Sequence, residues 1–303
     1  MTGAPPPGLV VVDKPGGLTS HDVVARVRRL AGTRKVGHAG TLDPMATGVL
    51  LVGVERATRL LGHLMLTEKA YDATVRLGSA TTTDDAEGEP TGGADASHLT
   101  RAAVLEAVSR FVGDIEQRPS AVSAIKVGGR RAYARVRAGE QVDLPARGVT
   151  VHELRVGTAR AEGARLDVEV SVRCSSGTYV RAIARDLGEV LGVGGHLTAL
   201  RRTAVGPFTL ADARPLDRLG DGTPGSLGAG AAGDGLLPMT EVARRCFPGV
   251  TLGEEQARDV GFGRRLTLRL GAPGPVAVFA PDGRFLALYE QRGEVAAPVA
   301  VLG

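Results

Sequence analysis

The sequence predicts an α+β protein, with a first domain built on a mixed β-sheet flanked by helices and a small, β-rich second domain. Helical and strand-like hydrophobic patterns both occur before residue 216, but they do not alternate as strictly as in a doubly wound parallel sheet. Only short strand-like runs follow residue 238, and the stretch between these parts is Gly-rich and of low complexity. We therefore predict a domain over 1–216, a linker or insertion over 217–238 and a second domain over 239–303.

Composition excludes several classes of protein. The 303 residues are 43% hydrophobic and 23% charged, which is usual for a folded chain. No apolar run approaches the roughly 18 residues needed to span a bilayer, and Met1–Pro7 has no signal-peptide pattern. Cys174 and Cys246 are too few for a disulfide framework or a paired-cysteine zinc site. We expect a cytoplasmic protein that holds no metal ion.

The first elements are a strand, a turn and a helix. Leu9–Val12 is a short apolar run that ends in Asp13–Gly17, which indicates a buried strand and a turn. Thr19 and Asp22 have the spacing of a capping box, and the helix that they begin ends before Gly32. Its apolar residues recur at helical spacing: Val23, Val24, Val27 and Leu30.

A strand with one buried face follows further along the chain. Over 71–77 the odd positions are apolar and the even ones polar, so Tyr71 is predicted to point inward. The same two patterns predict the other elements of the first domain: a loop over 34–48, a strand over 49–54, a helix over 57–66, a loop over 78–97, a helix over 104–112, a strand over 166–174, a helix over 178–191 and a strand over 197–205.

The second domain is predicted to be a small all-β module. Its short strands are Leu266–Leu270, Val276–Ala280 and Phe285–Tyr289. Asp282-Gly283 lies between the last two, and this dipeptide is typical of a tight hairpin.

Charge is unevenly distributed along the chain. The formal net charge is +4. The stretch 118–137 contains Arg and Lys but no acid, whereas 84–95 contains Asp and Glu but no base. A basic run is either a solvated face or a contact surface for nucleic acid, and charge alone leaves both open.

The loop Gly37–Gly48 combines several glycines with His38 and Asp43. Asp43 precedes Pro44, an order that is typical of a helix N-cap followed by a first-turn proline. The chain has no phosphate-loop, dinucleotide-binding, metalloprotease or serine-hydrolase motif, so those chemistries lose their usual support.

Six ordered segments resemble the signature motifs of the TruB-type tRNA pseudouridine synthase family. They are Asp13–Ser20, Gly37–Gly48, Lys69–Tyr71, Arg118–Lys126, Cys174–Arg181 and His196–Arg202. The C-terminal domain resembles, more weakly, a PUA-type RNA-binding domain. The resemblance implies a pseudouridine synthase catalytic domain followed by a PUA-like β-barrel. It also implies a reaction without cofactor or metal, in which the T-loop uridine at tRNA position 55 becomes pseudouridine.

The resemblance assigns catalytic roles to three residues. Asp43 acts as the nucleophile, attacking the sugar or the uracil ring or serving a glycal route. Arg181 pairs with that carboxylate and keeps it ionised, and Tyr71 stacks on the target base and is the leading candidate proton acceptor. Without the resemblance, Arg181 reads as a solvent-facing helical residue and Tyr71 as ordinary core.

The resemblance also assigns RNA contacts. Tyr179 and Leu200 contact the uracil, and His38 contacts the T-loop and fills the space left by the flipped uridine. The expected contacts to the RNA backbone of the T-arm stem-loop are Lys14, Lys126, Arg130 and Arg131. Both lysines are also open to a packing role. We expect a monomer with no obligatory protein partner.

Three other functions remain open from the sequence. A guide-RNA-dependent pseudouridine synthase shares the catalytic signature but works inside a ribonucleoprotein. A tRNA-binding or tRNA-folding protein would have secondary or lost catalysis, although Asp43, Tyr71 and Arg181 are all present. An aspartate-based nucleoside hydrolase would release free uracil.

Overall fold

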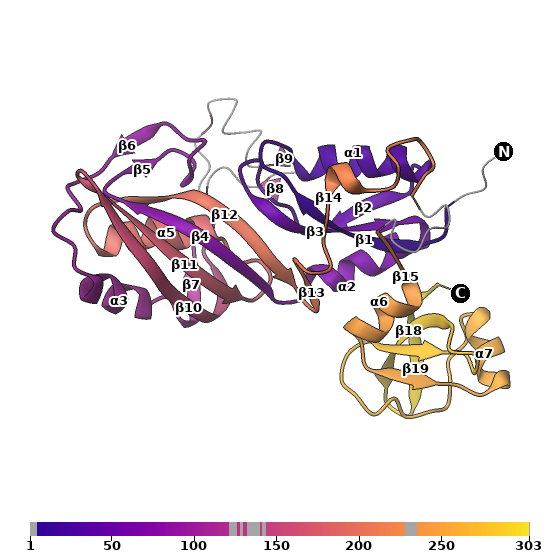
Figure 1. Cartoon of the computed structure of the whole chain (residues 1–303). Coiled ribbons are helices and arrows are strands. Elements are labelled where there is room, and N and C mark those ends of the chain that lie inside the picture. The colour runs from indigo at the N-terminus through magenta and orange to yellow at the C-terminus, as the bar shows by residue number, and fades with distance from the viewer. Residues whose placement is uncertain are drawn as a thin grey trace. The chain divides into compact units, whose positions relative to one another are not determined.

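The computed structural model describes residues 5–120, 126–127, 130–131, 140, 144–227 and 235–302 (Figure 1). The chain divides into two compact units, which we describe separately. The terminal unit comprises Met1–Pro44, Gly48–Met65 and Val205–Gly303, and the central unit comprises Met45–Thr47 and Leu66–Ala204. This grouping differs from the boundaries predicted at 216 and 238, which stay a prediction about how the chain is built from domains.

The sheet of the terminal unit forms around β1 (Gly8–Lys14), because its apolar residues can be buried on both faces. β1 pairs antiparallel with β3 (Thr47–Val54), and Val11 lies opposite Leu51. The other described strands of this unit before the C-terminal module are β2 (Val36–Ala39), β13 (Phe208–Thr209), β14 (Arg214–Pro215) and β15 (Leu236–Pro238). β14 and β15 both pair with β1, the former in parallel, so the sheet is mixed as predicted.

Helix α1 (Ser20–Ala31) confirms the predicted capping box. The Thr19 side chain accepts a hydrogen bond from the Asp22 backbone, and Asp22 accepts one in return. The helix ends at Gly32, whose φ of 65° suits glycine. The predicted helix over 57–66 is instead a 3₁₀ turn, η1 (Glu55–Leu60), followed by the short helix α2 (Leu61–Met65).

The Gly-rich stretch begins with the 3₁₀ turn η2 (Leu216–Arg218), and its first part packs on α1. The Gly225 and Leu227 backbone amides donate to the carbonyl oxygens of Arg29 and Leu30, at 3.3 Å and 3.0 Å. Leu227 is fully buried. The described part of the predicted linker is therefore attached to the terminal unit.

The C-terminal module contains an open sheet. Its strands are β16 (Gly249–Thr251), β17 (Val276–Phe279), β18 (Phe285–Arg292) and β19 (Val295–Val301), in that spatial order. Two helices accompany it, α6 (Met239–Cys246) and α7 (Glu254–Gly261), so the all-β prediction was wrong. The predicted strand 266–270 contributes one isolated bridge, Leu266 to Ala296, and the described residues form no closed barrel.

Five described strands of the central unit pair side by side in the order β12-β4-β11-β10-β7. They are β12 (Gly195–Val205), β4 (Lys69–Leu77), β11 (Arg165–Cys174), β10 (Arg147–Glu162) and β7 (Gly113–Gln117). Two short ladders join β5 (Ala80–Thr81) to β6 (Pro90–Gly92) and β8 (Lys126–Val127) to β9 (Arg130–Arg131).

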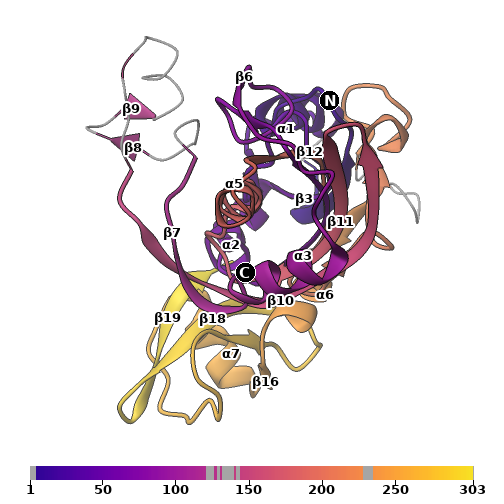
Figure 2. The same cartoon turned by 90° about the vertical axis from the view of Figure 1, so that its left-hand side faces the viewer.

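On the concave side of the curved sheet, helix α3 (Arg101–Ser109) packs on β10 and helix α5 (Val180–Val190) packs on β4 (Figure 2). They cover the inward residues of β4 and β11, which alternate as predicted. Helix α5 lies against the backbone at the start of β12, where a Cβ atom on Gly188 would clash with Gly194 and Gly195. This close approach fixes the position of α5. No helix in the described ranges is long and apolar enough to cross a membrane.

Candidate active site

The loop that carries Asp43 is fastened inside the terminal unit. Lys14 Nζ donates to the carbonyl oxygens of Pro15, Leu18 and Pro44, at 2.9, 2.7 and 3.2 Å. The Gly17 amide also donates to the Pro44 carbonyl, at 2.8 Å. Because Lys14 is 0% exposed, its position supports the packing role and not the expected contact with an RNA phosphate.

His38 lies on β2, opposite Val52 of β3. Its half-buried ring packs edge-on against the ring of His21, with 5.6 Å between the ring centroids. Its contact with a T-loop stays a prediction. The strand itself was missed, because the expectation for 34–48 was a loop.

Tyr71 and Leu200 are buried in the central unit. Tyr71 is 7% exposed and lies opposite Val172, so the predicted inward orientation is confirmed. Leu200 lines a cavity of about 600 Å³, whose walls also include Met45, Thr47, Thr74, Ser171 and Arg201. Met45 follows Asp43 by two residues, so the motif loop continues into a wall of this cavity. Base stacking on Tyr71 and uracil contact by Leu200 stay predictions.

Tyr179 immediately precedes α5 and is held by a residue that the sequence reasoning missed. The Tyr179 amide donates to Gln117 Oε1 at 2.9 Å, and Gln117 Nε2 donates to the Tyr179 carbonyl at 3.3 Å. Gln117 is the last residue of β7 and is 1% exposed. Its carboxamide therefore makes the same pair of hydrogen bonds to the Tyr179 backbone that a residue of a neighbouring strand would make. A buried glutamine at a strand end gives no sequence signal that would identify this pairing.

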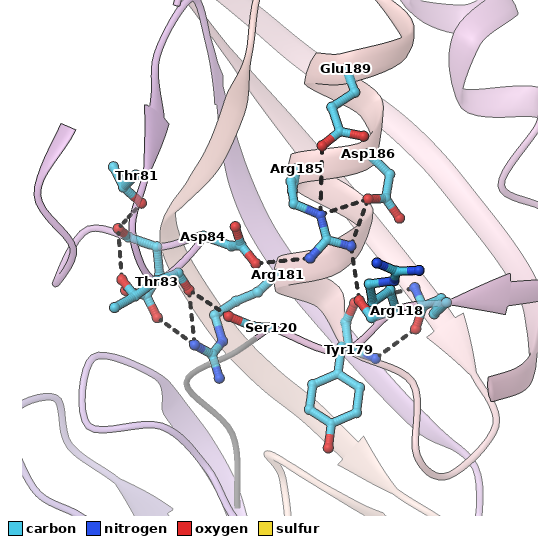
Figure 3. A network of polar contacts seen from close by, with 12 residues as sticks. Thr81, Thr83, Asp84, Arg118, Ser120, Tyr179, Arg181, Arg185, Asp186 and Glu189 are labelled. Carbon is cyan, nitrogen blue, oxygen red and sulfur yellow. Dashed lines mark hydrogen bonds and ion pairs between the residues drawn. The ribbon is translucent and has the colours of Figure 1, made fainter. Parts of the chain in front are cut away.

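Arg181 is buried in an ion pair. Its Nη1 lies 3.2 Å from Asp85 Oδ2 and donates to the Thr83 carbonyl at 2.9 Å (Figure 3). The solvent-facing alternative is excluded, because the two side chains are 6% and 3% exposed. Asp43 belongs to the terminal unit and Arg181 to the central unit, so their pairing stays a prediction. Asp85 was missed, although it lies in the acidic stretch 84–95 that the sequence had predicted as a loop.

A second ion pair lies beside the first. Arg185 Nη1 lies 3.1 Å from Asp84 Oδ2, and Arg185 Nη2 donates to the Arg118 carbonyl at 2.8 Å. The Tyr179 ring points away from these contacts (Figure 3). Burial raises the pKa of the Asp84 carboxyl, and the charge of Arg185 opposes that rise. Adjacent carboxylates thus face arginines one helical turn apart on α5.

Lys69 and Cys174 lie opposite each other on β4 and β11, near Arg202. Lys69 Nζ donates to the Thr67 carbonyl at 2.7 Å. Burial lowers the pKa of Lys69 to about 8, and the charge of Arg202 lowers it further. Burial raises the pKa of the Cys174 thiol, which keeps it protonated and favours packing over nucleophilic chemistry.

The remaining expected RNA contacts lie at the edge of what the structure describes. Lys126 pairs with Arg131, and Arg130 with Val127, in the β8–β9 ladder. Their side chains lie outside the described part, so their contact with RNA stays a prediction. Across the described ranges, no three or more His, Cys, Asp or Glu side chains form a group that could hold a metal ion.

Comparison with known proteins identifies the class first. The family model "TruB family pseudouridylate synthase (N terminal domain)" matches residues 28–180. Two further models, "tRNA pseudouridylate synthase B C-terminal domain" and "tRNA Pseudouridine synthase II, C terminal", match residues 181–223 and 247–303. These matches define a pseudouridylate synthase, an isomerase. More particularly, the chain belongs to the TruB family.

Individual relatives are similar over nearly the whole chain. The "tRNA pseudouridine synthase B" of Thermobifida fusca (strain YX) is 57% identical over 97% of this chain and 98% of its own. The protein of the same name from Arthrobacter sp. (strain FB24) is 55% identical, covering 97% and 96%. Among solved structures, "Crystal Structure of a Cbf5-Nop10-Gar1 Complex" matches with a TM-score of 0.73 and 26% identity, covering 98% of this chain and 85% of that one.

Proposed function

We propose that this chain is a tRNA pseudouridine synthase that converts the T-loop uridine at tRNA position 55 to pseudouridine. The observation that carries the proposal is the similarity, over nearly the full length, to proteins named tRNA pseudouridine synthase B at 55–57% identity. The T-loop position is what the resemblance of the six motif segments to the family implies.

The proposed chemistry begins at Asp43. Pseudouridylation breaks the bond between N1 and C1′, rotates the uracil and rejoins it through C5. Attack on the sugar, attack on the uracil ring and the glycal route all require an ionised Asp43 carboxylate. We propose that Arg181 pairs with this carboxylate and favours its ionised form.

Tyr71 and Leu200 serve the uracil in this proposal. The target uridine leaves the RNA stack, at a cost of a few kcal/mol, so that C1′ and C5 become accessible. Tyr71 then stacks on the base and takes up the proton that C5 loses, while N1, freed from the sugar, gains one, so that the base loses and gains one proton. Leu200 and Tyr179 hold the ring. Exclusion of water from the site once the RNA is bound favours rejoining of the uracil over its release.

The RNA is held through charge and shape. The basic segment 118–137 contacts the backbone of the T-arm stem-loop, and the PUA-like module supplies further RNA contact. The protein acts as a cytoplasmic monomer without cofactor, metal or obligatory protein partner. The guide-RNA-dependent alternative has less support, because the Cbf5 structure is 26% identical to this chain.

Tritium release from an unmodified tRNA transcript, labelled at uridine C5, tests the proposal. Wild-type protein should release tritium from one T-loop uridine without added guide RNA. Asp43→Asn should bind the tRNA equally well and release none, because the amide is no nucleophile. Release of free uracil would indicate a hydrolase. Tight binding without release by wild type would contradict the catalytic proposal, and a requirement for guide RNA would contradict the stand-alone one.

A further inference from the structure

A buried hydroxyl group is bonded to the residue that immediately precedes Asp43. The Leu42 amide donates to Ser20 Oγ at 2.9 Å, and Ser20 Oγ donates to the Leu42 carbonyl at 3.1 Å. Ser20 and Leu42 are 1% and 4% exposed, so water does not replace these bonds. One side chain thus satisfies both backbone groups of Leu42 across 22 positions of sequence.

The helix start does not need this hydroxyl. Ser20 is the first residue of α1, but capping is performed by the exposed Thr19, whose hydroxyl accepts from the Asp22 amide at 3.1 Å. Asp22 Oδ2 accepts from the Thr19 amide at 2.8 Å, which completes the capping box. The Ser20 hydroxyl is directed to the motif loop instead.

The residue after Asp43 is held from the same segment of chain. The Pro44 carbonyl accepts from the Gly17 amide and from Lys14 Nζ. Asp43 therefore lies between two backbone positions that are each fixed by hydrogen bonds to 14–20. Breaking the buried bonds on the Leu42 side costs about 1–3 kcal/mol when a polar group is left unsatisfied, which resists displacement of the Asp43 Cα.

We propose that Ser20 is a positioning residue that fixes the backbone of Asp43 for nucleophilic attack. The inference rests on the proposed function, in which Asp43 is the nucleophile. A misplacement of about 1 Å costs roughly 100-fold in rate where a reacting group must meet its target. Ser20 acts through the loop and does not touch the substrate in this role.

The neighbouring Thr19 provides a matched control. Ser20→Ala should lower kcat for tritium release roughly 10- to 100-fold and leave KM for tRNA within about twofold, because RNA contacts are retained. Ser20→Cys should behave like Ser20→Ala, since it keeps the volume but bonds weakly. Thr19→Ala removes a bond from the same helix start and should lower Tm while leaving kcat unchanged.

Several results would overturn the inference. The positioning role falls if Ser20→Ala retains wild-type kcat while Asp43→Asn is inactive. It also falls if Thr19→Ala lowers kcat as much as Ser20→Ala, because helix stability then explains both. Wild-type kcat in Asp43→Asn would instead contradict the proposed function and the positioning role together. Circular dichroism and Tm of each variant separate loss of rate from loss of fold.

Discussion

Burial of the Lys69 ammonium lowers its pKa to about 8, so its charge changes within an accessible pH range. The unfolded chain has the ordinary value of 10.5. Between these two values the unfolded state binds more protons, so the contribution of Lys69 to the free energy of unfolding rises with pH. Below about pH 8 Lys69 is charged in the folded protein as well, so burying this charge lowers the free energy of unfolding by its full amount.

Replacing Lys69 with Met should therefore stabilise the protein more at pH 7 than at pH 10. The difference in unfolding free energy between variant and wild type should shrink by about 3 kcal/mol over that range. Urea denaturation at both pH values measures it. Lys35→Met, at a side chain that is 76% exposed, is the control. It shows how much of the pH-dependent change in unfolding free energy comes from removing any lysine. If the difference in unfolding free energy between variant and wild type did not change with pH, the lowered pKa of Lys69 would be contradicted.

At the scale of residues, the alternation of apolar and polar positions predicted which side chains are buried, but it did not predict which residues they contact. The inward orientation of Tyr71 followed from a two-residue period. The partner of Arg181 could not be predicted this way, because Asp85 lies 96 positions earlier and only the fold brings them together. The same holds for Gln117, which lies 62 positions from Tyr179.

Gln117 connects two elements, the end of β7 and the start of α5. Replacing it with Ala leaves the Tyr179 amide and carbonyl without this partner inside the protein. We expect a loss of about 1–3 kcal/mol in unfolding free energy, and no smaller loss for Gln117→Glu at neutral pH, because this change buries a carboxylate and removes the donor to the Tyr179 carbonyl. Chemical denaturation of both variants measures this.

Gln256→Ala is a suitable control for Gln117, since it removes a weaker capping contact of 3.4 Å at the start of α7. It should cost less than Gln117→Ala. Equal losses in the two variants would show that the pairing with Tyr179 contributes nothing specific.

At the scale of elements, the helices and strands whose apolar residues recur with a clear period were predicted, and those with a weak period were missed. β1, α1, β4, β11 and α5 each bury a continuous stripe or run. β10 does not, because irregular pairing between Val151 and Glu153 and between Val156 and Ala159 interrupts its alternation. Its second half is also exposed on both faces. α7 was missed because only Val260 is buried.

At the scale of the whole molecule, Arg245 ties the C-terminal module to the segment before the Gly-rich stretch. Its two terminal nitrogens each lie 2.9 Å from an Asp212 oxygen, and its guanidinium lies 4.5 Å from the centroid of the Phe208 ring. Buried apolar residues of α6, β17 and β18 share a core with β1 and β3. We expect the module and the rest of the terminal unit to unfold together.

Arg245→Ala should lower the unfolding free energy by about 1 kcal/mol, allowing for partial exposure of the pair. Arg245→Lys should restore little of it, because an ammonium cannot form the forked contact or stack on the ring. Calorimetry measures both, and wild-type stability in Arg245→Ala would contradict the link. A separate transition for the module would contradict joint unfolding.

The predicted family and the mixed sheet are confirmed, and the roles of the motif segments stay predictions. The compact units were not foreseen. Linear boundaries cannot represent a unit whose parts come from both ends of the chain, as Met1–Pro44 and Val205–Gly303 do. The predicted barrel required closure between strands that lie at the two edges of an open sheet. The pattern of apolar and polar residues within single strands does not show whether the two edge strands of a sheet pair with each other.

The pairing of β1 with β14 has a consequence for synthesis on the ribosome. Val12 and Arg214 lie about 200 residues apart, so β1 leaves the ribosome roughly 10–40 s before its parallel neighbour at ordinary elongation rates. During that interval it has β3 beside it, but its other edge stays open to pairing with other chains. The central unit, by contrast, is nearly contiguous in sequence, because almost all of it lies in 66–204. This segment is available to fold as soon as it emerges. Nascent chains stalled before residue 214 should therefore leave this edge of β1 available for pairing with other chains.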